Sequence, residues 1–205
     1  MRIVSRFSIL CTTIVLLLVS LTGCSDPKSI SLSQDSVILA FGDSLTQGVG
    51  APNEQSYPAQ LTRQLGVPAI NAGISGETSS QGLARIESLL QEHAPDLVII
   101  CYGGNDLLRK LPLSQLKQNL EKMILLSQAH GAKVLLVGVP KPAIFLDPVP
   151  IYGELAEQYH LSAELDILSD LLDDKAMKSD AVHLNATGYQ AFAQALAKLI
   201  EISPY

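Results

Sequence analysis

The sequence predicts a single α/β domain in which a central parallel sheet of about five strands lies between two layers of helices. From residue 37 onward, short apolar runs of strand length alternate with longer stretches that have helical spacing of apolar residues. The run from Leu97 to Tyr102 also lacks the polar alternation of a strand with one exposed face, so we expect helices on both of its faces. Strands joined by helices pack as right-handed parallel units, which gives a three-layer α/β/α sandwich.

The individual elements follow from apolar spacing and from residues that end helices and strands. Gly131 is suited to cap the longest helix, and Pro140 ends the fourth strand. A fifth strand is expected around Asp166 to Leu168, where the pattern is weak. In chain order the sequence predicts strand 36–41, helix 57–65, strand 68–71, helix 78–93, strand 97–102, helix 113–131, strand 133–140, one or two helices within 151–172, and a last helix over 186–200.

The first 23 residues have the features of an export signal. A basic start is followed by an apolar core, Phe7 to Leu21, that is short for a membrane span. The sequence LTGC, which ends at Cys24, resembles the lipobox of bacterial lipoproteins. We therefore predict a lipoprotein signal peptide over 1–23 and a lipid at Cys24; the alternatives are an ordinary signal cut nearby and an uncleaved anchor. The expected location is outside the cytoplasm on a bacterial membrane, the outer membrane where the cell has one.

The remaining chain divides into a polar segment and one domain. Residues 24–36 have the composition of a flexible tether, so we place the folded domain at 37–205. Loss of residues 1–23, with two arginines and no acidic residue, would change the formal net charge from −6 to −8. Such an acidic chain is a poor nucleic-acid binder.

Only Cys101 would remain as a free thiol, and we expect it in the core. No heptads indicate an assembly, so we expect a monomer.

Polar, glycine-containing loops follow the first three strands. They read GDSLTQG (42–48), NAGISGE (71–77) and GGND (103–106), and loops at the carboxyl ends of parallel strands meet at one edge of the sheet. We expect the turn to present the Ser44 hydroxyl at the start of a helix, where amide N–H groups favour negative charge. A serine hydroxyl needs a base to act as a nucleophile, and the base needs a partner that fixes its tautomer. His183 and Asp180, three residues apart before the last helix, are the candidates.

The segments GDSLTQG, GGND and DAVH, together with Gly73, resemble the signature blocks of the SGNH, or GDSL, hydrolases. The similarity is greatest to the bacterial multifunctional thioesterase, arylesterase and lysophospholipase group, and it covers nearly all of the expected domain. It implies a flavodoxin-like fold and a catalytic triad of Ser44, His183 and Asp180. It also implies an oxyanion hole formed by the N–H groups of Ser44 and Gly73 and the side chain of Asn105. Asp43 and Asp106 match positions that support loop structure.

The resemblance implies a serine esterase that needs no cofactor and no metal. Carboxylic esters would be hydrolysed through an acyl-enzyme, and thioesters or lysophospholipids are further substrates of this class. The partners would be a small-molecule ester or a lipid, and a membrane held through Cys24. Removal of O-acetyl groups from polysaccharide or peptidoglycan is the alternative reaction, and a non-catalytic lipid- or glycan-binding lipoprotein is a further alternative. The apolar residues of 141–152 are candidates for an acyl pocket.

Overall fold

A computed structural model describes residues 29–141 and 149–203, and Cys24 and the predicted signal peptide lie outside this range. The central sheet has five strands in the order β3-β2-β4-β5-β6, and all neighbouring strands are parallel. This is the order of flavodoxin-like folds, so the predicted fold class is confirmed. The strands are β2 (Ile38–Gly42), β3 (Ala69–Gly73), β4 (Leu97–Cys101), β5 (Lys133–Val137) and β6 (Ser162–Glu164).

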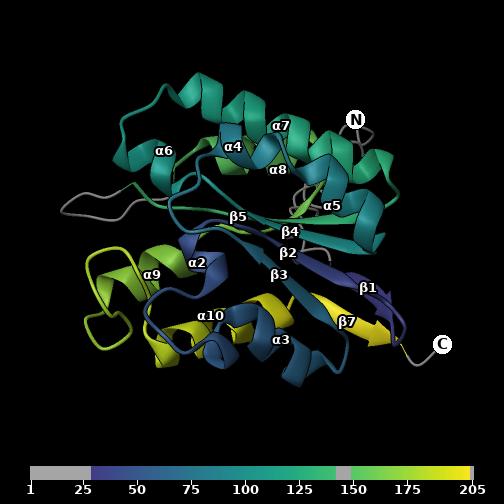
Figure 1. Ribbon diagram of the computed structural model, residues 1–205, viewed down its shortest axis with the longest axis horizontal. Coiled ribbons are helices and arrows are strands. Elements are labelled where there is room, and N and C mark those ends of the chain that lie inside the picture. The colour runs from purple at the N-terminus through teal and green to yellow at the C-terminus, as the bar shows by residue number, and fades with distance from the viewer. Residues whose placement is uncertain (1–28, 142–148, 204–205) are drawn as a thin grey trace, which may run out of the picture.

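Helices cover both faces of the sheet (Figure 1). Helices α4 to α8 lie on one face, whereas α3, α9 and α10 lie on the other. None of the helices within the described ranges is long and apolar enough to span a membrane. The helices are α2 (Ser44–Gln47), α3 (Tyr57–Leu65), α4 (Ser79–Leu83), α5 (Ile86–His93), α6 (Gly104–Leu108), α7 (Leu113–Ala129), α8 (Ile151–Gln158), α9 (Ile167–Asp173) and α10 (Ala186–Ala197), with a short 3-10 turn at Asn53–Gln55.

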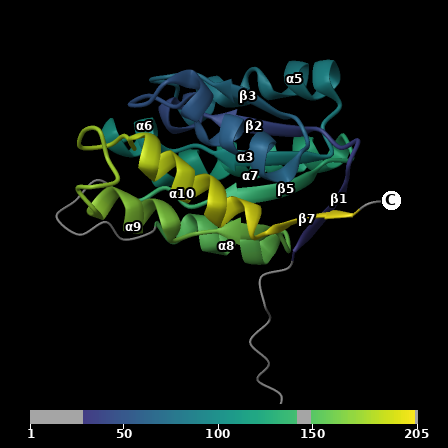
Figure 2. The same ribbon diagram turned by 90° about the horizontal axis from the view of Figure 1, so that it is seen from below.

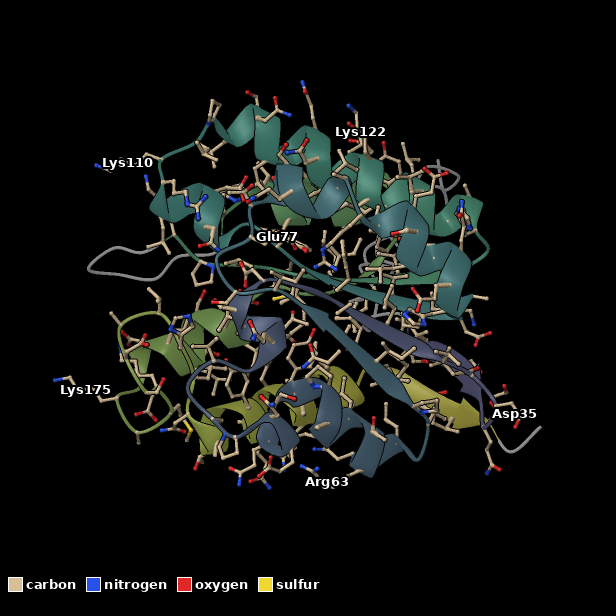
Figure 3. The ribbon with its side chains drawn as sticks, viewed as in Figure 1. Asp35, Arg63, Glu77, Lys110, Lys122 and Lys175 are labelled. Carbon is tan, nitrogen blue, oxygen red and sulfur yellow. The ribbon has the colours of Figure 1, made fainter. Side chains whose placement is uncertain are left out.

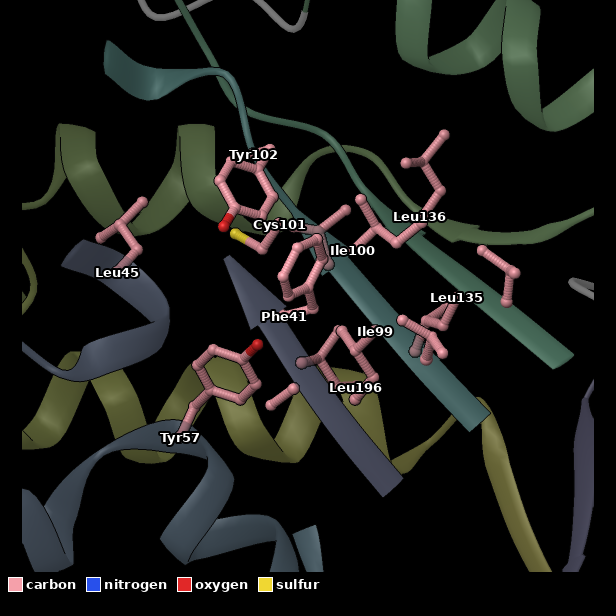
Figure 4. Close-up of a cluster of buried hydrophobic side chains, with 14 of the residues drawn as sticks. Phe41, Leu45, Tyr57, Ile99, Ile100, Cys101, Tyr102, Leu135, Leu136 and Leu196 are labelled. Carbon is pink, nitrogen blue, oxygen red and sulfur yellow. The ribbon is translucent and has the colours of Figure 1, made fainter. Parts of the chain in front are cut away.

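The core lies around the two central strands, because every residue of β2 and β4 is buried. Figure 4 shows Phe41 of β2 beside Tyr102, which follows β4, and their ring centroids are 4.8 Å apart. Cys101 lies in the same cluster, and burial raises the pKa of its thiol well above the usual value. The continuous apolar run that predicted a central strand is therefore buried on both faces, and Cys101 is a core residue.

A strand lies in the segment that we expected to be a flexible tether. Strand β1 (Ile30–Ser33) pairs in parallel with β7 (Ile200–Ser203) in a separate two-stranded sheet, seen beside α10 in Figure 2. The prediction that the folded domain begins at residue 37 is therefore wrong, since the fold includes Ile30. The ISLS segment contains only two apolar residues, and its partner is far away in sequence, so local composition did not reveal the pairing.

Two further elements differ from the sequence prediction. The helix expected over 78–93 is divided into α4 and α5, and Arg85 lies at the break between them. The fifth strand is β6 at Ser162–Glu164, whereas Asp166, where the strand was expected, is the N-cap residue of helix α9. Strand β6 has only three residues and lies at the edge of the sheet, where β5 is its one neighbour. A strand of this length is too short to show a clear alternation of apolar and polar residues in the sequence.

The pairing of β1 with β7 generates a stability prediction. Leu32 of β1 is 4% exposed, so Leu32→Ala should lower the free energy of unfolding by about 2–5 kcal/mol through lost burial and a cavity. Urea unfolding followed by circular dichroism measures the change. Ser31→Ala, on the exposed face of the same strand, is the matched control and should stay within about 0.5 kcal/mol. Equal stability of the two variants would mean that β1 is not part of the folded unit.

Candidate active site

The loops after β2, β3 and β4 meet at the carboxyl edge of the sheet, as the strand order requires. The register places Gly42 at the end of β2 opposite both Gly73 of β3 and Cys101 of β4. Helix α2 begins at Ser44 just past this edge, and α6 begins at Gly104 beside it. Polar side chains from separate parts of the sequence are therefore brought to one rim.

A hydrogen-bonded relay joins Ser44, His183 and Asp180 at this rim. His183 Nε2 lies 2.9 Å from Ser44 Oγ, and His183 Nδ1 lies 2.7 Å from Asp180 Oδ2. A carboxylate only accepts hydrogen bonds, so Nδ1 carries a proton toward Asp180 and the unprotonated Nε2 accepts from the Ser44 hydroxyl. The structure thus brings together the three residues that the sequence singled out.

The loop before α10 holds Asp180 in its ionised form. Its Oδ1 accepts the backbone N–H groups of Val182 at 2.9 Å and of His183 at 3.0 Å. Partial burial opposes ionisation, but these hydrogen bonds and the neighbouring imidazole outweigh it, so the pKa of Asp180 is lowered. Asp180 can therefore orient the imidazole and stabilise its protonated form.

The turn between β2 and α2 fixes the position of Ser44. A Cβ at Gly42 would lie 2.1 Å from Thr46 Oγ1 and 2.5 Å from the Cys101 carbonyl oxygen, so only glycine fits there. Asp43 is the N-cap of α2 and accepts the Leu45 N–H at 3.1 Å. Burial raises the pKa of Asp43 to about 6, although the Leu45 N–H and the nearby His183 oppose the shift. Asp43 thus supports the turn, in agreement with the sequence analysis.

Three hydrogen-bond donors face the space in front of Ser44. Asn105 Nδ2 donates to the Glu77 carbonyl oxygen at 3.1 Å, and a longer contact of 3.4 Å reaches Asp43 Oδ2. The backbone N–H groups of Ser44 and Gly76 have no acceptor among the residues that the structure describes. Ser44, Gly76 and Asn105 all line one pocket. The arrangement can therefore stabilise a negatively charged oxygen beside the serine hydroxyl.

The prediction for Gly73 is wrong. Its N–H donates to Asn71 Oδ1 at 3.0 Å, and the residue lies at a separate surface hollow instead of the Ser44 pocket. Gly73 is glycine for a packing reason, since a Cβ there would lie 2.1 Å from the Gln47 nitrogen in α2. The donor that the sequence analysis missed is Gly76, three residues later. Its φ of +78° in the same glycine-containing loop is the conformational signal that distinguishes it.

Arg85 ties the loop that carries Gly76 to the sheet. Its guanidinium donates to both carboxylate oxygens of Glu77, at 2.7–3.0 Å, and to the carbonyl oxygen of Ala72 at 2.7 Å. It also donates to the Tyr102 hydroxyl at 2.7 Å, and this hydroxyl donates to Glu77 in turn. The guanidinium carbon lies 4.6 Å from the centre of the Phe41 ring. Glu77 is thereby held with its backbone carbonyl toward Asn105.

A second buried network fixes α6, which carries Asn105. The carboxylate of Asp106 accepts the N–H of Ser79 at 2.8 Å and its hydroxyl at 2.6 Å. Asn119 of α7 donates to the same Ser79 hydroxyl at 2.9 Å. Asp106 therefore links α6 to α4 and α7, which is the supporting role expected from the sequence.

The pocket in front of Ser44 has a volume of about 560 Å³. One part of its wall is polar and includes Ser44 and His183 of the relay, whereas another part is apolar. The segment 141–152 was expected to contribute, but residues 142–148 lie outside the described structure. Tyr152 is buried, and its hydroxyl donates a hydrogen bond to the Tyr102 carbonyl oxygen at 2.8 Å. The apolar side chains that line the pocket are Leu45, Leu108, Val139, Pro140, Leu172, Ala181 and Val182.

The raised pKa of Asp43 predicts a pH-dependent stability. Because about 6 exceeds the ordinary value of 3.8, the folded state binds this proton more tightly than the unfolded state does. The free energy of unfolding should therefore fall by about 3 kcal/mol as pH rises from about 4 to about 6, and then level off. Asp43→Asn keeps a capping side chain and should remove this component in urea unfolding across that range. The exposed Asp35→Asn is the control, and parallel curves for all three proteins would contradict the prediction.

Comparison with known proteins agrees with this geometry. Esterase TesA of Pseudomonas aeruginosa is 44% identical over 110 residues, which cover 51% of this chain and 55% of that protein, so the chain spans about half of that relative's length. Thioesterase 1/protease 1/lysophospholipase L1 of Escherichia coli (strain K12) is 31% identical over 172 residues, covering 80% of this chain and 83% of that protein. A crystal structure of TesA superimposes with a TM-score of 0.72 at 31% identity, covering 80% of this chain and 97% of that one.

A family model, described as GDSL-like lipase/acylhydrolase, matches residues 40–191. The matched range includes the loop with Ser44, the α6 loop with Asn105 and the loop with Asp180 and His183. The match extends over most of the chain. The chain belongs to the GDSL-like lipase/acylhydrolase family.

Proposed function

We propose that the protein is a serine esterase in which Ser44 is the nucleophile, His183 the general base and Asp180 the residue that orients it. The observation that carries this proposal is the continuous relay from Asp180 through His183 to Ser44, with distances of 2.7 and 2.9 Å, at a pocket lined by unpaired N–H donors. The relation to proteins named esterase and thioesterase 1/lysophospholipase L1 supports the same reaction class.

The first half of the reaction forms an acyl-enzyme. Ser44 Oγ attacks the ester carbonyl carbon while His183 Nε2 takes the hydroxyl proton. The carbonyl oxygen becomes negative and accepts hydrogen bonds from the N–H groups of Ser44 and Gly76 and from Asn105 Nδ2, which gives up its long 3.4 Å contact with Asp43 Oδ2. The intermediate then collapses, the bond to the leaving group breaks, and the His183 imidazolium returns its proton to the departing oxygen or sulfur.

Water completes the cycle. His183 Nε2 removes a proton from the water molecule as its oxygen attacks the acyl carbon, and the same three donors stabilise the second oxyanion. Collapse of this intermediate breaks the bond to Ser44 Oγ, which regains its proton from His183, and the carboxylic acid is released. The protein's own side chains supply every proton transfer in this scheme.

The pocket composition supports an acyl chain as the bound group. Aliphatic side chains such as Leu108, Val139 and Leu172 line the wall near Ser44, and they can bury methylene groups, each worth about 0.8 kcal/mol of transfer free energy. A sugar would instead need polar partners along this wall. We therefore infer a carboxylic ester with an aliphatic acyl chain as the preferred substrate class over an O-acetylated polysaccharide.

The central prediction concerns Ser44. Ser44→Ala in the full chain should lower kcat for p-nitrophenyl acyl esters by about 10⁴-fold or more and abolish labelling by a fluorophosphonate probe. Ser88→Ala, an exposed serine on α5, should leave both unchanged. A series of esters from acetate to palmitate measures the acyl length that the pocket accepts. Normal turnover by Ser44→Ala would contradict the mechanism, and an unlabelled, inactive wild type would favour a non-catalytic binding protein.

Arg85 should act as a positioning residue for the oxyanion donors. Arg85→Lys keeps the charge but cannot hold Glu77, Ala72 and Tyr102 at once, so the loop with Gly76 should shift. We expect kcat to fall by about 10–100-fold with little change in KM, because the donors act mainly in the transition state. Arg63→Lys, at an exposed position of α3, is the control. A change in stability with normal kcat in the remaining folded enzyme would show that Arg85 serves packing alone.

A further inference from the structure

Exposed large apolar side chains gather beside the candidate active site. In the described part of the chain, large apolar side chains are notably exposed at five positions. Four of these are Leu108, which lines the Ser44 pocket, and three residues close in sequence to residues of the pocket wall. The fifth, Leu125, lies farther along α7, three helical turns from the start of that helix. The four are Ile74 (47% exposed), Leu108 (48%), Leu111 (40%) and Leu113 (46%).

These four residues belong to one structural unit. Leu108 lines the pocket, and Ile74 precedes Ser75 and Gly76, which also line it. Arg109 Nη2 donates to the Gly76 carbonyl oxygen at 2.8 Å and so joins the two loops. The Leu111 N–H donates to the Asp106 carbonyl oxygen at 2.8 Å, which fixes the turn between α6 and α7. Hydrogen bonds thus hold the backbone that carries the exposed side chains next to residues of the pocket wall.

The charges beside these leucines are opposite in sign to those of the whole chain. Residues 107–120, LLRKLPLSQLKQNL, contain three cations and no acid, although the formal net charge of the chain is −6. Lys117 pairs with Glu154 at 2.6 Å. Arg109 donates to a neutral carbonyl, and Lys110 has no carboxylate within ion-pair distance in the described residues. Two cations therefore remain to meet an external anion.

We propose that this rim patch, formed by Ile74, Leu108, Leu111 and Leu113 with Arg109 and Lys110, docks the protein on an anionic lipid bilayer so that the pocket opens toward the lipid. Leucines can enter the acyl region while the cations meet anionic headgroups, which is the arrangement of interfacial membrane contacts. The proposal rests on the proposed esterase function for its consequence, namely that the substrate ester reaches Ser44 from the bilayer. Docking itself does not depend on catalysis.

A second copy of the chain fits this patch less well than a bilayer does. A two-fold interface would place the same patch on both subunits, so Arg109 and Lys110 of one copy would face those of the other. Like charges at such a contact are unfavourable, and residues 107–120 contain no acid to offset them. An anionic membrane surface satisfies both the apolar and the cationic side chains.

The test uses the full chain reconstituted in vesicles of phosphatidylcholine or of an equimolar mixture of phosphatidylcholine and phosphatidylglycerol. The variant Lys110→Glu/Leu111→Ser/Leu113→Ser alters only patch residues outside the pocket wall. Lys122→Glu/Leu125→Ser on α7 is the matched control; Figure 3 shows Lys110 and Lys122 projecting to solvent at separate places. Residues before 29 are identical in all proteins, so their contribution to membrane binding is shared.

Two readouts separate docking from catalysis. Hydrogen exchange of residues 107–114 in a Ser44→Ala background measures docking without turnover. The exchange should be slower on anionic than on neutral vesicles, and this difference should disappear in the patch variant. The second readout is the rate of hydrolysis of p-nitrophenyl palmitate in the vesicles divided by the rate for soluble p-nitrophenyl butyrate. On anionic vesicles this ratio should fall about tenfold in the patch variant and stay unchanged in the control variant.

Several results would overturn the proposal. One is that residues 107–114 exchange at the same rate on anionic and on neutral vesicles. Another is that the rate ratio falls as much in the control variant as in the patch variant. A third is a concentration-dependent dimer that the patch variant loses while its rate ratio stays normal. Absence of activity on both esters, with slower exchange still seen on anionic vesicles, would instead contradict the esterase proposal and leave docking supported.

Discussion

The Arg85 guanidinium holds together the parts of the molecule on which the site depends. It is bound to the end of β3 through Ala72, to the loop after β3 through Glu77, and to the residue after β4 through Tyr102. The ion pair is partly buried, with side-chain exposures of 21% for Arg85 and 8% for Glu77. A buried charge without its partner is costly, so this cluster has one strongly preferred arrangement. That arrangement defines where Gly76 and Asn105 lie relative to Ser44.

The parallel sheet explains why such distant residues meet. Glycine at the end of β2 permits the close turn into α2, and the neighbouring strands end at the same level. Helices α4 and α6, bridged by the Asp106 and Ser79 hydrogen bonds, then support the loops from outside the sheet. Each donor therefore depends on backbone whose position is set by buried contacts, so the donors are preorganised.

The sequence predicted the architecture and identified the three residues that the structure brings together in the relay, because the relevant signals are local. The apolar run of β4 indicated a central strand, and Asp180 and His183 are close in sequence and interact within one loop. Signals that depend on distant contacts were missed. Strand β1 is specified by its pairing with β7, and the break between α4 and α5 is associated with the reach of Arg85 toward Glu77 and Tyr102.

The two glycines at the end of β3 and in the loop after it illustrate the same limit. Gly73 is the last residue of β3 and Gly76 lies in the loop that follows, and composition does not distinguish a glycine required for close packing from one with positive φ. Only the three-dimensional arrangement separates them, because the N–H of Gly73 is bound to Asn71, whereas Gly76 lines the pocket and its N–H has no acceptor among the described residues.

In the proposed mechanism, the exposure of the relay has a consequence for the fate of the acyl-enzyme. The side chain of Asp180 is 52% exposed and that of His183 is 19% exposed, so the relay lies at the protein surface beside bulk solvent. Ser44 and His183 also line the pocket, so water that enters the pocket lies beside both, and at its bulk concentration it competes strongly with any alcohol or amine for the acyl group. A site of this kind favours release of a free acid over acyl transfer to a second substrate, which would require a pocket that excludes water.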